Sequence, residues 1–342
     1  MSMDRTLETR KVQFTGNSTY TISLPKEWAD HHGVEAGMQL PLYPSDNGEL
    51  VIGADRAGDD ERPAVDVTGM SAADVRQTVE ALYAAGNEQF ALGSDDGIER
   101  EHRRAAETVA ADRTGLQLQR ESETELLFGT ILDTESVSIE RTVLQLQYTA
   151  LSMHRNAVRA LLDGNATVAG SAVGRWDDVV RRLDVASSCF HRSLTDVESL
   201  DSLGYSRPAM FDRYAVSRHL ASVTEQAKRT AEAVNEQDRV ERASWAAELD
   251  CHAEQSRDYV ERAVDAALTA DHPPHELVQS SRSLAEAVSD LRRRAYREDD
   301  VTYAWATAMD GVERTATTAA AVAERAVQAA LRDDVDESVA LE

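Results

Sequence analysis

Carboxylates four residues apart on one helix face could bind a metal ion. Glu286 and Asp290 have this spacing. Side chains at positions i and i+4 of a helix point the same way, and carboxylate oxygens suit hard divalent cations. Glu286 and Asp290 are therefore a candidate pair of metal ligands. The same spacing is common on a solvated acidic helix, so a metal-free surface stays open as an alternative.

Motifs for catalysis are missing from the sequence. The nine histidines show no H-x-x-x-H or H-E-x-x-H spacing, and Cys189 and Cys251 stand singly in helical segments. The chain has no G-x-S-x-G, no G-x-x-x-x-G-K-[ST] and no G-x-G-x-x-G after a strand. We therefore expect a protein that is not an enzyme.

The densest basic run of the chain is Arg292–Arg294 with Arg297. Such a run could contact an anion or an acidic partner. It stands directly before Glu298, Asp299 and Asp300, so a surface ion-pair network is the favoured interpretation.

Composition excludes several classes of protein. The 342 residues include 61 acidic and 36 basic side chains, for a formal net charge of −25. Two cysteines cannot form a disulfide scaffold, and no segment approaches the ~18 uncharged apolar residues of a membrane span. The first residues lack the apolar core of a signal peptide. We expect a cytoplasmic protein without membrane insertion.

The basic residues are almost all arginines, because only Lys11, Lys26 and Lys228 are lysines. A strongly acidic, lysine-poor chain resembles proteins from salt-loving organisms, whose cytoplasm holds molar salt. At about 1 M salt the Debye length is roughly 3 Å, so the surplus charge repels itself weakly while it keeps the protein hydrated. We expect a halophilic protein whose carboxylates mostly form a solvated surface.

The pattern of the chain predicts a multidomain protein with three parts. Residues 1–53 alternate as short strands, with a short helix opened by Pro25, and the polar run 53–63 resembles a linker. Residues 64–135 predict a small α/β spacer, with a helix opened by Ser71 and Asp74 as a capping box.

Residues 139–332 predict helices almost throughout. Apolar stripes recur at helical steps, for example at Leu277, Leu284, Val288 and Leu291. Breakers fall at Gly164, Gly204 with Pro208, 235–238, Pro273–Pro274 and 298–300. They divide the segment into six helices of two similar halves, which predicts a bundle of two three-helix repeats.

The N-terminal segment resembles the AbrB/SpoVT/MazE swapped-hairpin family. Residues 10–42 read RKVQFTGNSTYTISLPKEWADHHGVEAGMQLPL, and the polar loop, alternating strand, L-P-K-x-W and G-x-x-x-G elements follow the family pattern. The resemblance implies a swapped-hairpin homodimer, because four short strands bury too little apolar surface alone.

The same resemblance implies binding of promoter DNA. By position, cations on the first strand and at the helix start would contact phosphates, and the polar loop could read a base edge. The DNA-binding candidates are Arg5, Arg10, Lys11, Asn17, Ser18 and Lys26. Residues 1–56 hold five cations and eight acids, however, so a module that only dimerises or binds a protein stays open.

The remainder of the chain resembles the archaeal PhoU family of phosphate-uptake regulators. The segments that resemble this family are LYAAGNEQFAL in the spacer, VVRRLDVASSCFHRSL at 179–194 and AMDGVERTATTAAAVAERA at 308–326. The resemblance implies a six-helix PhoU-like domain and, through E/D-x-x-x-D motifs, iron or zinc at Glu286, Asp290 and Glu313. The motif is incomplete here, since Arg181 follows Asp177 and Thr317 follows Glu313 at the second carboxylate position.

These observations lead to one function and two alternatives. We expect a dimeric DNA-binding transcription regulator of phosphate uptake and homeostasis, whose helical domain senses transport status through the ATPase subunit of a phosphate transporter or another regulator. One alternative is an adaptor that acts on a phosphate ABC transporter without binding DNA. The other is a helical metal-binding protein.

Overall fold

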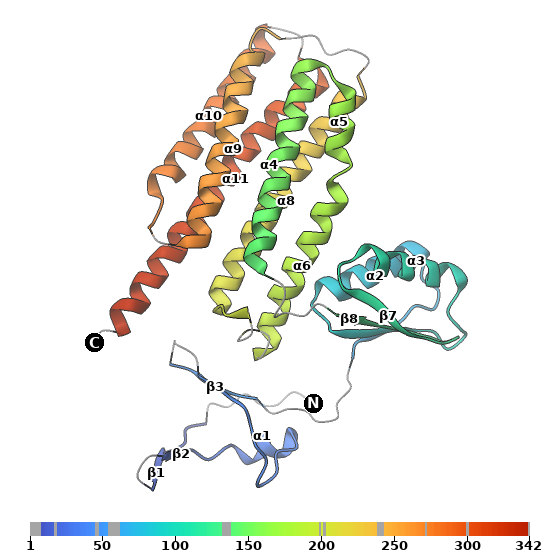
Figure 1. Cartoon of the computed structure of the whole chain (residues 1–342), viewed down its shortest axis with the longest axis vertical. Helices are drawn as coiled ribbons and strands as arrows, with labels where there is room; N and C mark the ends of the chain where they lie inside the picture. The colour runs from blue at the N-terminus through green and yellow to red at the C-terminus, as the bar shows by residue number, and fades with distance from the viewer. Residues whose placement is uncertain are drawn as a thin grey trace. The chain divides into compact units, whose positions relative to one another are not determined.

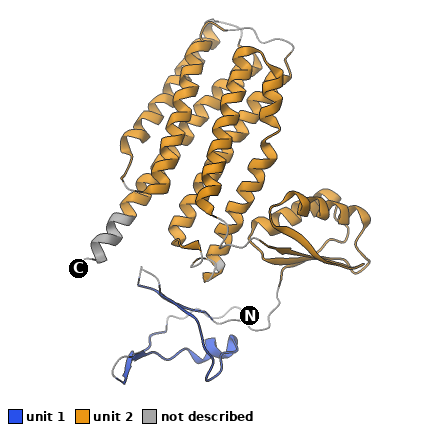
Figure 2. Ribbon diagram, viewed as in Figure 1, with its two compact units in different colours: residues 1–61 blue, residues 62–342 orange. Residues whose placement is uncertain are grey.

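A computed structural model shows two compact units, residues 1–61 and 62–342 (Figures 1 and 2). The two are described separately below. The structure describes residues 8–16, 19–44, 48–53, 62–131, 138–197, 200, 203–237, 243–270, 272–298 and 301–340, with only the backbone of 195 and 333–340.

The first unit consists of two short antiparallel hairpins and one short helix. Strand β1 pairs with β2 with Phe14 opposite Tyr20, and β3 pairs with β4 with Tyr43 opposite Val51. The elements are β1 (Gln13–Thr15), β2 (Thr19–Thr21), α1 (Lys26–His31), β3 (Leu42–Pro44) and β4 (Leu50–Ile52). Pro25 precedes α1, as predicted, since its missing N–H would lack an intrahelical partner there anyway.

The second unit begins with a four-stranded sheet. Its strand order is β5-β6-β8-β7, with β5 and β6 parallel and the other pairs antiparallel. The strands are β5 (Ala64–Asp66), β6 (Gln89–Gly93), β7 (Leu116–Glu121) and β8 (Glu125–Thr130), and the helices are α2 (Ala72–Ala84) and α3 (Arg100–Asp112). Phe90 stacks on Phe128 across the sheet, in one core with Tyr83 of α2 and Val109 of α3.

Helix α2 begins with the capping box predicted from the sequence. The Ser71 hydroxyl accepts a hydrogen bond from the Asp74 backbone N–H, and the Asp74 carboxylate accepts one from the Ser71 N–H. Two of the orphan N–H groups of the first turn are thereby satisfied.

Long helices make up the rest of the second unit (Figure 1). They are α4 (Ile139–Asp163), α5 (Ala166–Val173), α6 (Trp176–Thr195), α8 (Arg207–Asn235), α9 (Ala246–Thr269), α10 (His275–Glu298) and α11 (Tyr303–Ala340). Helix α11 packs against α8, α9 and α10, and α4 packs against α8. In the described part of the chain, none of the helices combines the length and apolarity that crossing a bilayer requires.

The predicted second helix of this region is interrupted. The sequence pattern predicts no break between Gly164 and Gly204, but α5 ends at Val173 and α6 starts at Trp176. Gly170 and Gly174 weaken the helix locally, because glycine has a high entropic cost in a helix.

Small side chains line the core of the helical region. An apolar stripe on α11 is buried: Met309, Val312, Ala316, Ala319 and Ala323 are each 0% exposed. The stripe on α10 is buried as well, from Leu277 to Ala295. Alanine allows helix axes to approach closely, so α11 can contact three neighbours at once.

The sheet part is attached to the helical region through α6. The Ser187 hydroxyl donates a hydrogen bond to the Ala84 carbonyl, and Arg192 forms an ion pair with Glu88. The guanidinium group of Arg113 lies between two carboxylates, 2.9 Å from that of Glu80 and 2.8 Å from that of Asp184.

Candidate nucleic-acid interface

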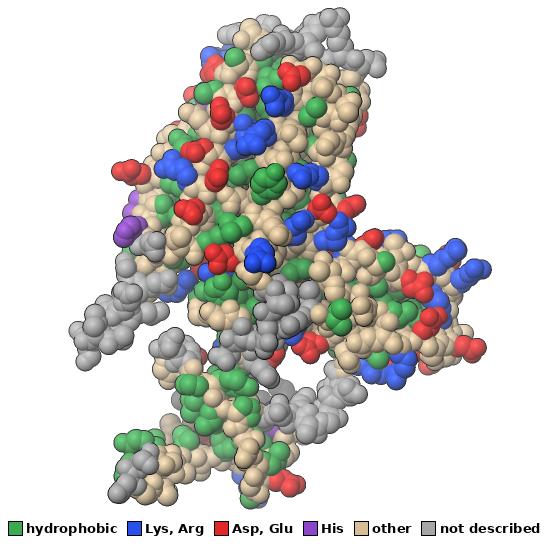
Figure 3. Space-filling model, viewed as in Figure 1, with side chains coloured by type: hydrophobic (Ala, Val, Ile, Leu, Met, Phe, Trp, Pro, Cys, Tyr) green, Lys and Arg blue, Asp and Glu red, His purple; other side chains and the backbone are tan. Residues whose placement is uncertain are grey.

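The two hairpins of the first unit expose large apolar side chains. Phe14 is 59% exposed and Tyr20 75% exposed, although their rings meet edge to face at 5.2 Å. Leu42 and Leu50 on the other hairpin are 56% and 54% exposed. Figure 3 shows hydrophobic side chains gathered on the visible face of this unit.

This unit also lacks a core of its own. None of its described residues is buried, and α1 buries no side chain. An isolated two-stranded hairpin is marginally stable in water, and contiguous exposed apolar surface marks an interaction site. The hairpins therefore need a partner to cover their apolar faces.

Phe14 and Tyr20 are absent from the site residues proposed from the sequence, which treats them only as members of alternating strands. Their register across β1 and β2 is the signal that could have found them. Among the described residues, the two-stranded sheet that carries these aromatic side chains has no third strand paired with it.

Three of the predicted DNA-binding residues are described, and all three are exposed. Lys26 is the first residue of α1. Arg10 and Lys11 precede β1, which begins at Gln13, so they lie before the first strand and not on it as the sequence analysis expects. Arg10 forms an ion pair with Glu8, whereas Lys11 and Lys26 have no ion pair with a described residue. The other three candidates, Arg5, Asn17 and Ser18, lie outside the described residues.

The candidate metal ligands are not brought together. Glu286 and Asp290 are exposed on α10, where Asp290 forms an ion pair with Arg293. Glu313 on α11 lies 2.9 Å from a guanidinium nitrogen of Arg292. Within the described ranges, no three His, Cys, Asp or Glu side chains form a group that could hold a metal ion. Arginines pair with two of these carboxylates, Asp290 and Glu313, and their charge opposes a cation there.

The cysteines differ in environment. Burial raises the pKa of the Cys189 thiol to about 11, so it stays protonated at neutral pH. Cys251 is exposed on α9. A protonated, buried thiol is a weak nucleophile, which fits a packing role for Cys189.

Comparison with protein families gives one match. Residues 13–60 match the family described as antidote-toxin recognition MazE, a bacterial antitoxin. The match covers both hairpins, Lys26 and the apolar pair Phe14 and Tyr20, but not Arg10 and Lys11. No curated protein matches the chain. Domains of the MazE/AbrB type typically dimerise and bind DNA. The chain therefore carries a MazE/AbrB-like antitoxin domain at residues 13–60, with the fold of a DNA-binding regulator.

Proposed function

We propose that this protein is a cytoplasmic, homodimeric transcription regulator that binds DNA through its N-terminal domain. The observation that carries the proposal is the match of residues 13–60 to MazE, in a segment whose hairpins have no core of their own. Pairing of two copies would cover Phe14, Tyr20, Leu42 and Leu50, and would double the exposed cations.

The chemistry of DNA contact rests on few charges. Lys11 and Lys26 are exposed, and Arg10 would have to exchange Glu8 for a phosphate. A dimer presents each of these twice, and phosphate contacts by Arg and Lys position a protein on the duplex. Asn17 and Ser18 stay the candidates for base contact, because amides and hydroxyls can pair with base edges.

The proposed signal is the state of phosphate uptake. The support is the resemblance of the helical region and the spacer to PhoU regulators, together with a long helical bundle after the DNA-binding domain. In this proposal the bundle contacts the ATPase subunit of a phosphate transporter or another regulator and favours one of two dimer arrangements. The chain then acts without catalysing a reaction.

Chromatin immunoprecipitation from the native host tests the proposal. Cells are grown in phosphate-rich and phosphate-poor medium, and we expect occupancy at transporter promoters to change between the two. If the protein occupies promoters to the same extent in both media, the DNA-binding function stands but phosphate is not the signal. No enrichment in either medium would overturn the regulator itself.

Binding to the recovered promoter then tests the residues. We expect the double variant Arg10→Ala, Lys11→Ala to bind DNA about tenfold or more weakly. Its affinity should also depend less steeply on salt concentration, because fewer phosphate contacts mean that fewer counterions are released on binding. The matched control is Arg262→Ala on α9, an exposed arginine paired with Asp258. Sedimentation of each variant verifies that the dimer persists. Equal affinity of the double variant and the control would remove this site assignment.

A second candidate is an adaptor that dimerises through the same domain and binds a protein instead of DNA. Its support is charge, since residues 13–60 hold two cations and eight acids, and Arg10 is paired within the chain. Acidic surface repels phosphates. The adaptor predicts a dimer with no promoter occupancy in either medium.

A further inference from the structure

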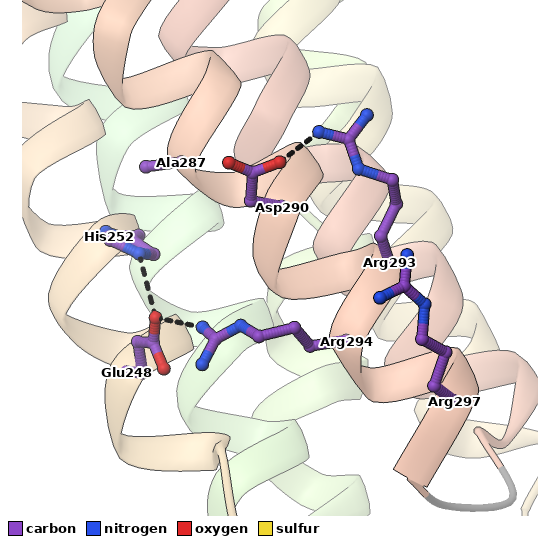
Figure 4. Close-up of a pocket in the computed structure, with 7 residues that line it drawn as sticks. All are labelled: Glu248, His252, Ala287, Asp290, Arg293, Arg294 and Arg297. Carbon is purple, nitrogen blue, oxygen red and sulfur yellow. Dashed lines mark hydrogen bonds and ion pairs between the residues drawn. The ribbon is translucent and has the colours of Figure 1, made fainter.

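A groove between α9 and α10 carries a positive surplus on a strongly acidic chain. Its volume is about 450 Å³, and it is lined by Glu248, His252, Ala287, Asp290, Arg293, Arg294 and Arg297 (Figure 4). Three arginines and two carboxylates line the groove, so its side chains carry a local surplus of positive charge. The whole chain, in contrast, has a net charge of −25.

Two of the arginines are already engaged. Arg294 lies 2.5 Å from Glu248, which links α10 to α9, and Arg293 forms an ion pair with Asp290. The Arg294–Glu248 pair ties the two helices together across the groove, and the Arg293–Asp290 pair holds Arg293 against its own helix. A guanidinium has five N–H donors in a fixed fork, so one carboxylate leaves several of them free for a ligand.

Arg297 is the third cation, and it has no ion pair with any described residue. It lies one helical turn from both Arg293 and Arg294, and like charges at this spacing destabilise a helix. An anion between these groups would remove the repulsion. Figure 4 shows Arg293 and Arg297 side by side along α10.

His252 supplies a further donor from the opposite helix. Neither ring nitrogen has a hydrogen-bond partner among the described residues, although both atoms are shielded from solvent. Its Nε2 lies 3.7 Å from Glu248, beyond hydrogen-bond distance. The ring as a whole is 16% exposed and Glu248 is its ion-pair neighbour (Figure 4), but shielded ring nitrogens without a hydrogen bond call for an explanation, and a ligand oxygen in the groove would provide one.

Ala287 keeps the groove open, because its methyl group contributes little volume to the lining. Ligand pockets of small molecules measure about 300 to 1,000 Å³, so the groove can hold a phosphoryl group with or without a small organic part. Arginine forks match the geometry of phosphate oxygens, which makes this anion the best chemical fit.

We propose that the groove between α9 and α10 binds a phosphoryl oxyanion through Arg297, Arg293 and Arg294, with His252 as an additional donor. The site rests on this geometry alone and does not depend on DNA binding. The ligand is either free inorganic phosphate or the phosphate ester of a small metabolite, and both present the same group to the arginines.

The test is titration calorimetry on the full chain with inorganic phosphate, glycerol 3-phosphate and chloride. Ionic strength and pH are matched, at a salt concentration where circular dichroism shows the chain folded. We expect saturable heat with at least one of the two phosphates and none with chloride. Tighter binding of inorganic phosphate or of the ester identifies the source of the phosphoryl group.

Variants locate the site. We expect Arg297→Gln to weaken binding about tenfold or more, since a hydrogen bond to a charged group contributes roughly that factor. Ala287→Leu fills the groove without a change of charge and should also abolish the heat. The matched control is Arg282→Gln on the same helix, where Arg282 pairs with Glu324 at 2.6 Å. Absence of phosphate-specific heat in the wild type, or an equal loss in Arg282→Gln, would overturn the proposal.

Discussion

The Nε atom of Arg113 lies 2.8 Å from Oδ2 of Asp184, and this ion pair joins the α/β part of the chain to α6. Nη2 of the same guanidinium lies 2.9 Å from Glu80. Burial raises the pKa of the Asp184 carboxyl to about 6, although Arg113 acts in the opposite direction. The carboxyl therefore ionises close to neutral pH, and its charged form depends on Arg113.

Removing Arg113 should destabilise the chain more at high pH than at low pH. In Arg113→Ala the ionised Asp184 loses its partner, and we expect a loss of about 2 to 3 kcal/mol near pH 8, because an unpaired charge in a protected site is costly. Near pH 5 Asp184 is mostly protonated, so the loss should be smaller. Urea unfolding followed by circular dichroism at both pH values measures the difference. An equal loss at both would show that Asp184 is not the group concerned.

His154 should make the chain less stable in acid. It is 2% exposed, and burial, with a smaller contribution from Arg257, lowers the pKa of its imidazole to about 3. The unfolded chain binds a proton below about pH 6.5, whereas the folded chain does not until about pH 3. The stability that this residue contributes is therefore complete above pH 6.5 and falls as the pH decreases.

The measurement compares wild type with His154→Gln, whose amide oxygen can still accept from Arg257. The wild type should lose about 1.4 kcal/mol more than the variant for each pH unit below 6.5. Parallel stability curves for the two proteins between about pH 4 and 7 would contradict the assignment.

Gly86 should not tolerate a side chain. Its φ is +81°, and a Cβ there would lie 2.8 Å from the Ser188 carbonyl oxygen on α6. We expect Gly86→Ala to lower the free energy of unfolding by about 2 to 4 kcal/mol, the sum of a left-handed backbone and an overpacked contact. The control is Gly164→Ala, where φ is +61° and nothing lies within 4 Å. That variant should lose only about 1 to 2 kcal/mol. Equal losses of unfolding free energy in the two variants would mean that the close contact between residue 86 and α6 does not contribute to the effect.

Charges on the first hairpin should separate the two chains of the proposed dimer. In the double variant Phe14→Asp, Tyr20→Asp, two carboxylates replace the exposed apolar pair, and the cost of burying them exceeds the gain from pairing. We expect the dissociation constant to rise about a hundredfold or more. Tyr148→Asp on α4 is the control, because Tyr148 is an exposed aromatic residue too, at 70%, but lies outside the MazE match. Analytical ultracentrifugation compares them, and a double variant that remains dimeric would show that another surface pairs the chains.

The sequence predicts those helices and helix ends that are determined by interactions between residues close together in the chain. The capping box at Ser71, the proline before α1 and the stripes on α10 and α11 follow from hydrogen bonds and helical periodicity within a few residues. The break at Gly174 was missed. Gly170 and Gly174 lie in an otherwise apolar run, and periodicity alone does not show that the helix ends there.

The site was harder to predict because it depends on residues that are far apart in sequence. Asp290 has the spacing of a metal ligand, but the three arginines that line the groove with it on α10 give the groove a positive surplus, and Glu248 of α9 closes its other side. The pairing of Glu248 with Arg294 spans 46 residues of sequence and leaves no local signal. In the first unit the short alternating strands predict a dimer, because they need a second chain to bury their apolar faces, and this stays a prediction.

No described residue of the N-terminal hairpins is buried, and this has a consequence for how the amount of protein could regulate its activity. A domain that gains its core only on pairing folds as it associates, so its folded fraction rises with the total concentration of the chain. The helical region has an extensive core within one chain and does not depend on a second copy for it. We expect occupancy of a promoter to increase more steeply than in proportion to protein level, which would make the rates of synthesis and degradation of the chain a control input in their own right.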